Sequence, residues 1–193
     1  MEGIIALATG LGLATASGLN AYLPLLTIGI FARLGWIELA APFDLLTNVF
    51  VLLIIAALAV LDFVGDKVPA VDSTLHAAGL VISPIAGAIL ALASMSDVAT
   101  INPILVGAAG LLVAGSTHAS RAAVRPVVTA ATAGTGNPVV SAVEDGAALT
   151  ISVLAILVPV LAIILALVLA VVAFRFFRRA RNVWRERQAV NGR

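Results

Sequence analysis

Five long stretches of this chain contain no Asp, Glu, Lys or Arg, and each is mostly apolar. A helix needs about 20 consecutive apolar residues to cross the hydrocarbon core of a bilayer, and most of the five reach that length. Backbone groups find no water to bind inside lipid, so such segments must fold as helices. The sequence therefore predicts an all-α bundle with about five membrane-spanning helices, over residues 3–32, 45–61, 73–96, 98–120 and 146–174.

The low charge content agrees with a lipid environment. Charged residues make up 11% of the chain and hydrophobic residues 62%, whereas charged residues make up about 25% of a soluble domain. The chain contains no cysteine, which excludes disulfides, thiolate metal sites and cysteine nucleophiles.

The basic residues are concentrated at the C-terminal end. Of the 11 Lys and Arg residues, seven lie at or after Arg175. Cytoplasmic flanks of membrane helices are rich in Lys and Arg, so we expect a transmembrane domain over residues 1–178 and an Arg-rich cytoplasmic tail over residues 179–193. Four basic side chains are expected to contact anionic lipid headgroups: Arg175, Arg178, Arg179 and Arg181. Five crossings then place the N-terminus outside, with Lys67, Arg121 and Arg125 toward the outside.

The first apolar stretch is longer than one straight crossing. It contains SGLNAYLP, in which Asn20 lies near mid-span and Pro24 follows four residues later. The helix is therefore either strongly tilted with a proline kink, or broken between Gly18 and Pro24. A break at membrane depth is tolerated only inside protein or beside a water-filled cavity. Small residues recur at every fourth position of this helix, which favours close helix contact and permits a homo-oligomer: Ala6, Gly10, Ala14 and Gly18.

Two Asn-Pro pairs predict helix starts. They occur in INP, with Asn102, and in GNP, with Asn137. Asparagine is a preferred N-cap and proline a preferred first helical residue, so both asparagines are expected to cap helices.

Ionisable side chains form a pattern within these apolar segments. His118, Arg121 and Arg125 are spaced three and four residues apart, so they share one helix face. In a five-span topology the other polar groups fall near the same membrane side. The residues expected to line an ion or substrate pathway are Asn20, Asp62, Asp66, Asp72, His76, His118, Arg121, Arg125, Asn137, Glu144 and Asp145.

Two interpretations of this convergence remain open. In the first, the charges mark helix ends, pair with one another and extend toward the headgroups. In the second, they line a site for an ion, a proton or an anionic solute. His76 and His118 suit proton transfer because histidine titrates near neutral pH, and Arg121 and Arg125 suit a phosphate or carboxylate. No metal is predicted, since no ligand spacing such as His-x-x-x-His occurs.

Enzyme signatures are missing from the chain. It contains no Walker-type phosphate loop, no His-Glu-x-x-His, no Gly-x-Ser-x-Gly and no dinucleotide fingerprint. We therefore predict no catalytic residues and no cofactor, and we rank an intramembrane enzyme acting on lipid below the non-enzymatic functions.

Several segments together resemble a known family. SGLNAYLPLLTIGIFARLG, DFVGDKVPAVDSTLH followed by SPIAGAIL, STHASRAAVRP and GTGNPVVSAVEDGAAL occur in the order typical of the bacterial membrane proteins grouped as domain of unknown function 4126. The resemblance extends to about Phe177. It implies a small helical protein of the bacterial inner membrane and brings no catalytic residues with it. At Ser83 the chain departs from the Arg-Pro expected there, so no basic group is expected at that position.

These features give two functional hypotheses from different classes. The first is a small transporter or channel-like protein with a polar intramembrane site for an ion or small solute. The second is a non-transporting scaffold or assembly partner whose basic tail binds anionic lipid or a soluble partner. The lipid bilayer is the expected environment in both, and neither involves nucleic acid.

Overall fold

A computed structural model of the protein describes residues 2–65, 69–95 and 101–159 and single positions at 161, 164, 168, 171, 175 and 178; at 69–74 and 76 it describes the backbone alone. Within these ranges every regular element is a helix, which confirms the predicted all-α class. The elements are α1 (Glu2–Leu19), α2 (Tyr22–Arg33), the 3-10 helix η1 (Phe43–Thr47), α3 (Val49–Gly65), α4 (Pro69–Ala93), α5 (Pro103–Thr132) and α6 (Asn137–Leu157).

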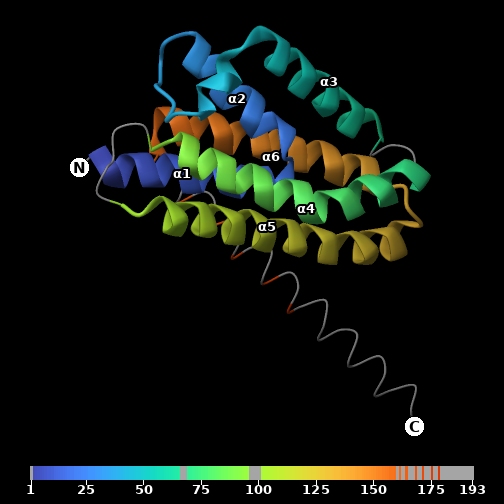
Figure 1. Ribbon diagram of the computed structural model, residues 1–193. Helices are drawn as coiled ribbons and strands as arrows, with labels where there is room; N and C mark the ends of the chain where they lie inside the picture. The colour runs from blue at the N-terminus through green and yellow to red at the C-terminus, as the bar shows by residue number, and fades with distance from the viewer. Residues whose placement is uncertain are drawn as a thin grey trace.

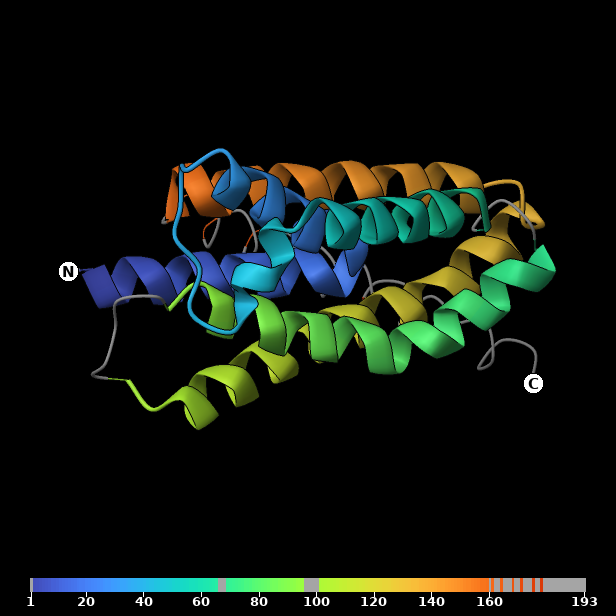
Figure 2. The same cartoon turned by 45° about the horizontal axis from the view of Figure 1, so that its top comes forward.

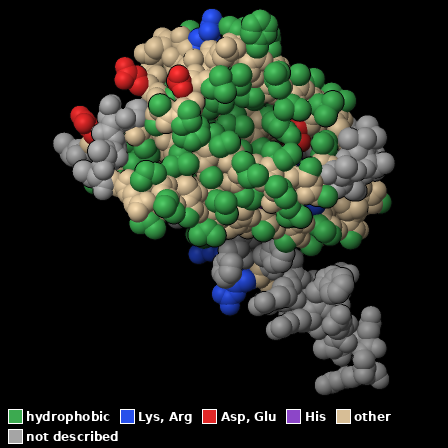
Figure 3. Space-filling model, viewed as in Figure 1, with side chains coloured by type: hydrophobic (Ala, Val, Ile, Leu, Met, Phe, Trp, Pro, Cys, Tyr) green, Lys and Arg blue, Asp and Glu red, His purple; other side chains and the backbone are tan. Residues whose placement is uncertain are grey.

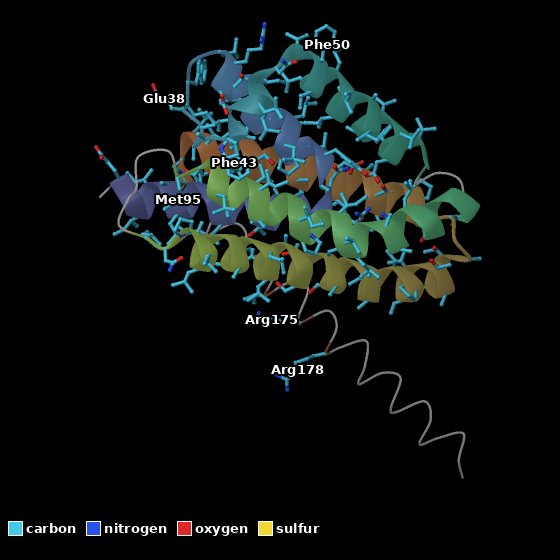
Figure 4. The ribbon with its side chains drawn as sticks, viewed as in Figure 1. Glu38, Phe43, Phe50, Met95, Arg175 and Arg178 are labelled. Atoms are coloured by element: carbon cyan, nitrogen blue, oxygen red, sulfur yellow. The ribbon has the colours of Figure 1, made fainter. Side chains whose placement is uncertain are left out.

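The helices and their surface suit a membrane. By length and composition, α1, α5 and α6 are long enough and apolar enough to cross one, and α2, α3 and the Ala77–Ala93 part of α4 are shorter apolar helices. The face in Figure 3 is covered largely by hydrophobic side chains. Ile4, Phe50 and Ile104 are each at least 75% exposed, and Phe50 points away from the bundle on α3 (Figure 4). Such a surface is unfavourable in water and favourable in lipid.

The first predicted span is broken, as one of the two alternatives predicted. Helix α1 ends at Leu19, and α2 begins at Tyr22 and runs back toward the end of the bundle at which α1 starts (Figures 1 and 2). At that end, the backbone N–H of Ala40, in the loop after α2, donates to the carbonyl of Ala93 on α4 at 2.9 Å. The alternative of one tilted helix is therefore wrong: α1 and α2 form a hairpin with Asn20 at its tip.

The ends of α5 and α6 differ from their predicted positions. Helix α5 continues past Ser120 to Thr132, because Arg121 and Arg125 have partners inside the bundle and do not end the apolar segment. Helix α6 begins at Asn137, nine residues before the predicted span, and ends at Leu157. Val158 leaves helical geometry at φ −143° and ψ 73°, since the residue before a proline is disfavoured in the α region.

Only one of the two predicted asparagine caps is present. Asn102 caps α5, because its Oδ1 accepts a 2.9 Å hydrogen bond from the Ile104 N–H. The prediction for Asn137 is wrong, since Gly136 occupies the N-cap position of α6 and no side chain caps it. Instead, Asn137 accepts a 3.1 Å hydrogen bond from the hydroxyl of Thr129 across the turn from α5.

Small residues allow α1, α4 and α5 to approach closely. A side chain at Gly87 on α4 would overlap the Ala114 side chain and the Gly110 carbonyl on α5. On α1, a side chain at Gly10 would press against the Ala91 backbone, and one at Gly18 would overlap Thr117. The predicted small-residue stripe of α1 is thus covered within the chain by α4 and α5.

An apolar core closes the end of the bundle where the chain begins. Five residues of this core cluster are fully buried: Leu13, Ile28, Leu90, Ala93 and Ala155. They come from α1, α2, α4 and α6. The buried ionisable side chains lie on the other side of this apolar plug, toward the C-terminal end of α3 and the turn that joins α5 to α6.

Candidate functional site

Asn20 connects three helices at the tip of the hairpin. Its Oδ1 accepts hydrogen bonds from the Tyr22 and Leu23 N–H groups at 3.0 and 3.1 Å, which satisfies backbone donors in the first turn of α2. Its Nδ2 donates to Asp62 Oδ2 on α3 at 3.0 Å and to Asp145 Oδ1 on α6 at 2.9 Å. Asn20 is only 2% exposed. The side-chain amide of Asn20 therefore caps the start of α2 and holds two carboxylates close together.

A second cluster forms between α5 and α6. Arg121 Nε and Arg125 Nη2 both donate to Glu144 Oε2, at 2.7 and 2.9 Å. The two guanidinium side chains are 5% and 6% exposed and the glutamate side chain 13%. Charge-assisted bonds of this length, largely removed from water, are strong and directional. They explain how α5 remains helical through two arginines.

Arg121 also closes the end of α1. Its Nη1 donates a 2.6 Å hydrogen bond to the carbonyl of Leu19, the last residue of that helix. The final carbonyls of a helix have no intrahelical donor and carry partial negative charge, so a cation there is favourable. The two halves of the hairpin are thus terminated by two buried side chains, Arg121 for α1 and Asn20 for α2.

His118 lies one turn before Arg121 on the same face of α5, as its spacing predicted. It is 2% exposed, and its Nδ1 lies 3.3 Å from Ser83 Oγ on α4. The ring fits because residue 79 is glycine: a Cβ there would stand 2.5 Å from His118 Cε1. Ser17 on α1 extends the polar contacts by donating to the Ser83 carbonyl at 3.3 Å.

A small cavity lies among these groups. Its volume is about 60 Å³. A cavity of this size holds a few water molecules. The cavity is lined by Ala21, Tyr22, Asp62, Leu75, Ala78, Gly79, Ile82, Ser83, His118 and Arg121. A carboxylate, an imidazole, a guanidinium, a phenol and a hydroxyl therefore border the same space.

The structure brings together most of the predicted site residues that it describes. Seven of them form the two clusters and the cavity wall: Asn20, Asp62, His118, Arg121, Arg125, Glu144 and Asp145. Asn137 is not among them, because it lies in the turn between α5 and α6. Asp66 lies outside the described residues, and Asp72 and His76 are described by their backbone alone.

The predicted headgroup arginines are described only in part. Arg175 and Arg178 are exposed and lie outside the bundle (Figure 4). Arg179, Arg181 and the rest of the predicted tail lie outside the described residues. Contact of these arginines with anionic lipid stays a prediction.

Sequence reasoning missed several side chains that complete the site. Tyr22, the single tyrosine of the chain, lines the cavity two residues after Asn20. Ser17 and Ser83 are hydroxyls within apolar helices, a signal that could have identified them, since buried hydroxyls need partners. Gly79 carried no signal, because its role depends on the neighbouring helix. Across the described residues, no three His, Asp or Glu side chains group closely enough to hold a metal ion.

Comparison with known proteins gives one match. The family model described as "Domain of unknown function (DUF4126)" matches residues 7–179. The match includes both clusters, the cavity lining and the helix break. No curated protein and no solved structure matches the chain.

Proposed function

The chain belongs to the DUF4126 family, and from that premise we propose that it is an integral membrane protein that moves an ion or small solute through the polar site at the Asn20 break. The observation that carries this proposal is the position of the site. Asn20, Asp62, Asp145, Arg121 and Glu144 meet where a membrane-compatible helix is interrupted, and a cavity adjoins them.

The cost of burying these groups supports a functional role. Ionisable side chains inside a membrane are costly and occur mainly on ion pathways, proton relays and substrate sites. Apolar side chains of similar size would often stabilise a bundle equally well, so stability alone does not account for a buried Arg–Glu–Arg cluster.

The interrupted helix supports the same proposal. Transporters place substrate and ion sites at breaks in membrane helices, where free helix termini face the site. Here the termini of α1 and α2 are both held by polar side chains that also border the cavity or the carboxylate pair. A break of this kind needs a protein-lined or watery surrounding, and the cavity supplies one.

Because α1 and α2 form a hairpin, the site faces the opposite side of the membrane from the one that five simple crossings predict. We propose a bacterial inner-membrane protein with the N-terminus outside and the C-terminus cytoplasmic. Because α1 and α2 enter and leave at one end, α3 starts outside, and the turns after α3 and α5 face the cytoplasm. Lys67, Arg121 and Arg125 then lie toward the cytoplasm, which satisfies the positive-inside rule better than five simple crossings. This orientation requires one further crossing after α6, and the 16 uncharged residues 159–174 would provide most of the about 20 residues that a full crossing needs.

Single-cysteine labelling tests whether water reaches the site. The chain has no cysteine, so each variant carries one thiol. Ala78→Cys lines the cavity, Thr135→Cys marks the turn at the site's end, and Leu34→Cys marks the opposite end. An impermeant maleimide added to right-side-out and inside-out vesicles should label Thr135→Cys from the cytoplasmic side. The thiol reagent Ag⁺, which is small enough for the cavity, should react with Ala78→Cys from the same side. Leu34→Cys should label from the outside.

A buried control and an opposite result complete the labelling test. Leu90→Cys, in the apolar plug at 0% exposure, should stay unlabelled from both sides. If Ala78→Cys is also silent from both sides while Thr135→Cys reacts, the site is sealed. The scaffold hypothesis, with the basic tail as its binding element, then replaces transport.

Currents test movement itself. Purified protein in liposomes on a solid-supported membrane should give transient currents on at least one concentration step among H⁺, Na⁺, K⁺ and Cl⁻. Asp62→Asn should abolish the current, and Ser120→Ala, exposed on α5, should leave it unchanged. The absence of current on all four steps contradicts the proposal.

A further inference from the structure

We infer that the ion taken up at this site is a proton, held by Asp62 or its neighbour Asp145 and exchanged with His118 through water in the cavity. The inference rests on the proposed function and specifies its substrate. It is carried by the size of the cavity, the charge of its walls and the two hydrogen-bonded systems that meet there.

The size of the cavity limits its occupant. A volume of about 60 Å³ accommodates a few water molecules or a single small ion and is too small for a large organic solute. Helices α2 to α5 form the walls of the cavity. Gly79 lies so close to the His118 imidazole that even a Cβ at this position would overlap the ring.

The charge of the walls selects among small ions. Arg121 lines the cavity and disfavours a free metal cation within it, whereas Asp62 lines the same cavity and disfavours a free anion. A proton meets neither obstacle, because it resides on a side chain or a water molecule and not in the open space. Alkali cations also require several oxygen ligands, and the polar part of this lining includes a guanidinium and an imidazole.

The groups beside the cavity are suited to proton exchange. Asp62 and Asp145 accept from the same Asn20 amide nitrogen, and repulsion between two neighbouring carboxylates is relieved when one of them binds a proton. His118 is the residue that most readily gains and loses a proton near neutral pH. The ionisable groups described around them are Tyr22 on α2, Asp62 on α3, His118, Arg121 and Arg125 on α5, and Glu144 and Asp145 on α6.

The transfer step conserves charge. The protonated Asp62 carboxyl gives its proton to a cavity water, and that water gives a proton to a ring nitrogen of His118. An uncharged acid and an uncharged imidazole become a carboxylate and an imidazolium, so the total charge of the pair stays zero. Ser83 Oγ, 3.3 Å from Nδ1, holds the ring in place during this exchange.

The relay ends inside the molecule in this conformation. Beyond His118 the polar contacts pass through Ser83 to Ser17, and the next layer is the apolar plug that contains Leu13 and Leu90. A proton that enters from the end of the bundle where α3 ends and α6 begins therefore reaches His118 and stops. Release at the opposite end requires the plug to open.

A dye assay tests the inference. Proteoliposomes enclosing pyranine, a pH-sensitive dye, are driven by a valinomycin-induced potassium potential, negative inside. Wild-type protein should acidify the interior. Asp62→Asn and His118→Gln should each slow acidification roughly tenfold or more, since each removes one of the two side chains that bind the proton. Ser120→Ala serves as the control on an exposed position of the same helix.

Two milder variants keep the test decisive if His118→Gln fails to fold. Gly79→Ala places a Cβ 2.5 Å from His118 Cε1 and displaces the ring without changing any ionisable group. Ser83→Ala removes the hydroxyl at Nδ1. Both should slow acidification and shift its pH profile, in protein that elutes as wild type in size exclusion.

The outcomes separate the two proposals. Currents without acidification mean that another ion moves: transport stands and the proton inference falls. Acidification that survives His118→Gln, Gly79→Ala and Ser83→Ala also overturns the relay, even if Asp62→Asn abolishes it. Absence of both current and acidification removes the proposed function itself.

Discussion

The guanidinium of Arg121 and the carbonyl of Leu19 lie 2.6 Å apart, so a side chain from α5 closes the last turn of α1. The two residues are far apart in sequence, yet this contact lies at the residue where α1 ends and caps it. The same arginine binds Glu144 on α6. Arg121 therefore joins the hairpin to α5 and α6, which carry the buried charged side chains of the described residues.

Arg121→Gln should strongly destabilise the protein. It removes one of the two guanidinium groups that bind Glu144 and the donor that closes α1, and breaking one partner of a buried ion pair costs about 3–5 kcal/mol. Thermal unfolding in detergent should show a large fall in apparent Tm. Arg33→Gln is the control, because the Arg33 bond to the Thr47 carbonyl is exposed and should contribute less than about 1 kcal/mol. Equal effects of the two changes would contradict the structural role given to Arg121.

The stability of two Asn20 variants should depend differently on pH, because Asp62 and Asp145 lie beside this residue. Asn20→Asp keeps an acceptor for the α2 N–H groups but adds a third carboxylate beside Asp62 and Asp145. Repulsion among the three is relieved when one is protonated, so this variant should be more stable at pH 5 than at pH 8. Asn20→Ala lacks the added charge and should be destabilised by about 1–3 kcal/mol at either pH. Unfolding temperatures of both variants across this range provide the test, and parallel profiles would count against the carboxylate pair.

Two glycines should respond in opposite ways to alanine. Gly87→Ala places a Cβ against the Ala114 side chain and the Gly110 carbonyl, so α4 and α5 must separate, at a cost of about 1–3 kcal/mol. Gly146→Ala on α6 meets nothing within 4 Å and should be neutral or stabilise by up to about 1 kcal/mol. Thermal unfolding of the pair tests the close approach of the helices. A tolerated Gly87→Ala would show that α4 and α5 are not packed as described.

The two Asn-Pro sequences should differ in their sensitivity to mutation. Asn102→Ala removes the N-cap bond to Ile104 and should cost about 1 kcal/mol. Asn137→Ala removes only an exposed contact with Thr129 and should cost less than about 0.5 kcal/mol. Measured under the same detergent conditions, a larger loss for Asn137 would indicate that it, and not Gly136, caps α6.

Much of the candidate site was predictable because helix periodicity is local. The spacing of His118, Arg121 and Arg125 placed them on one face, and the structure buries that face. The partners of these residues could not be derived in the same way. Glu144 and the Leu19 carbonyl come from other helices, and their contacts with Arg121 depend on how the helices pack.

Local sequence was enough to predict the helical class and the membrane-compatible surface, and it identified Gly18 to Pro24 as the stretch where the first helix either kinks or breaks. Each of these follows from local chemistry: apolar length, charge content and an asparagine and proline within one stretch. Only the tertiary structure decided that the break turns the chain back on itself, that α5 continues through its arginines and that Gly79 makes room for His118. Those outcomes depend on contacts between distant segments, where a buried charge is tolerated only if another helix supplies its partner.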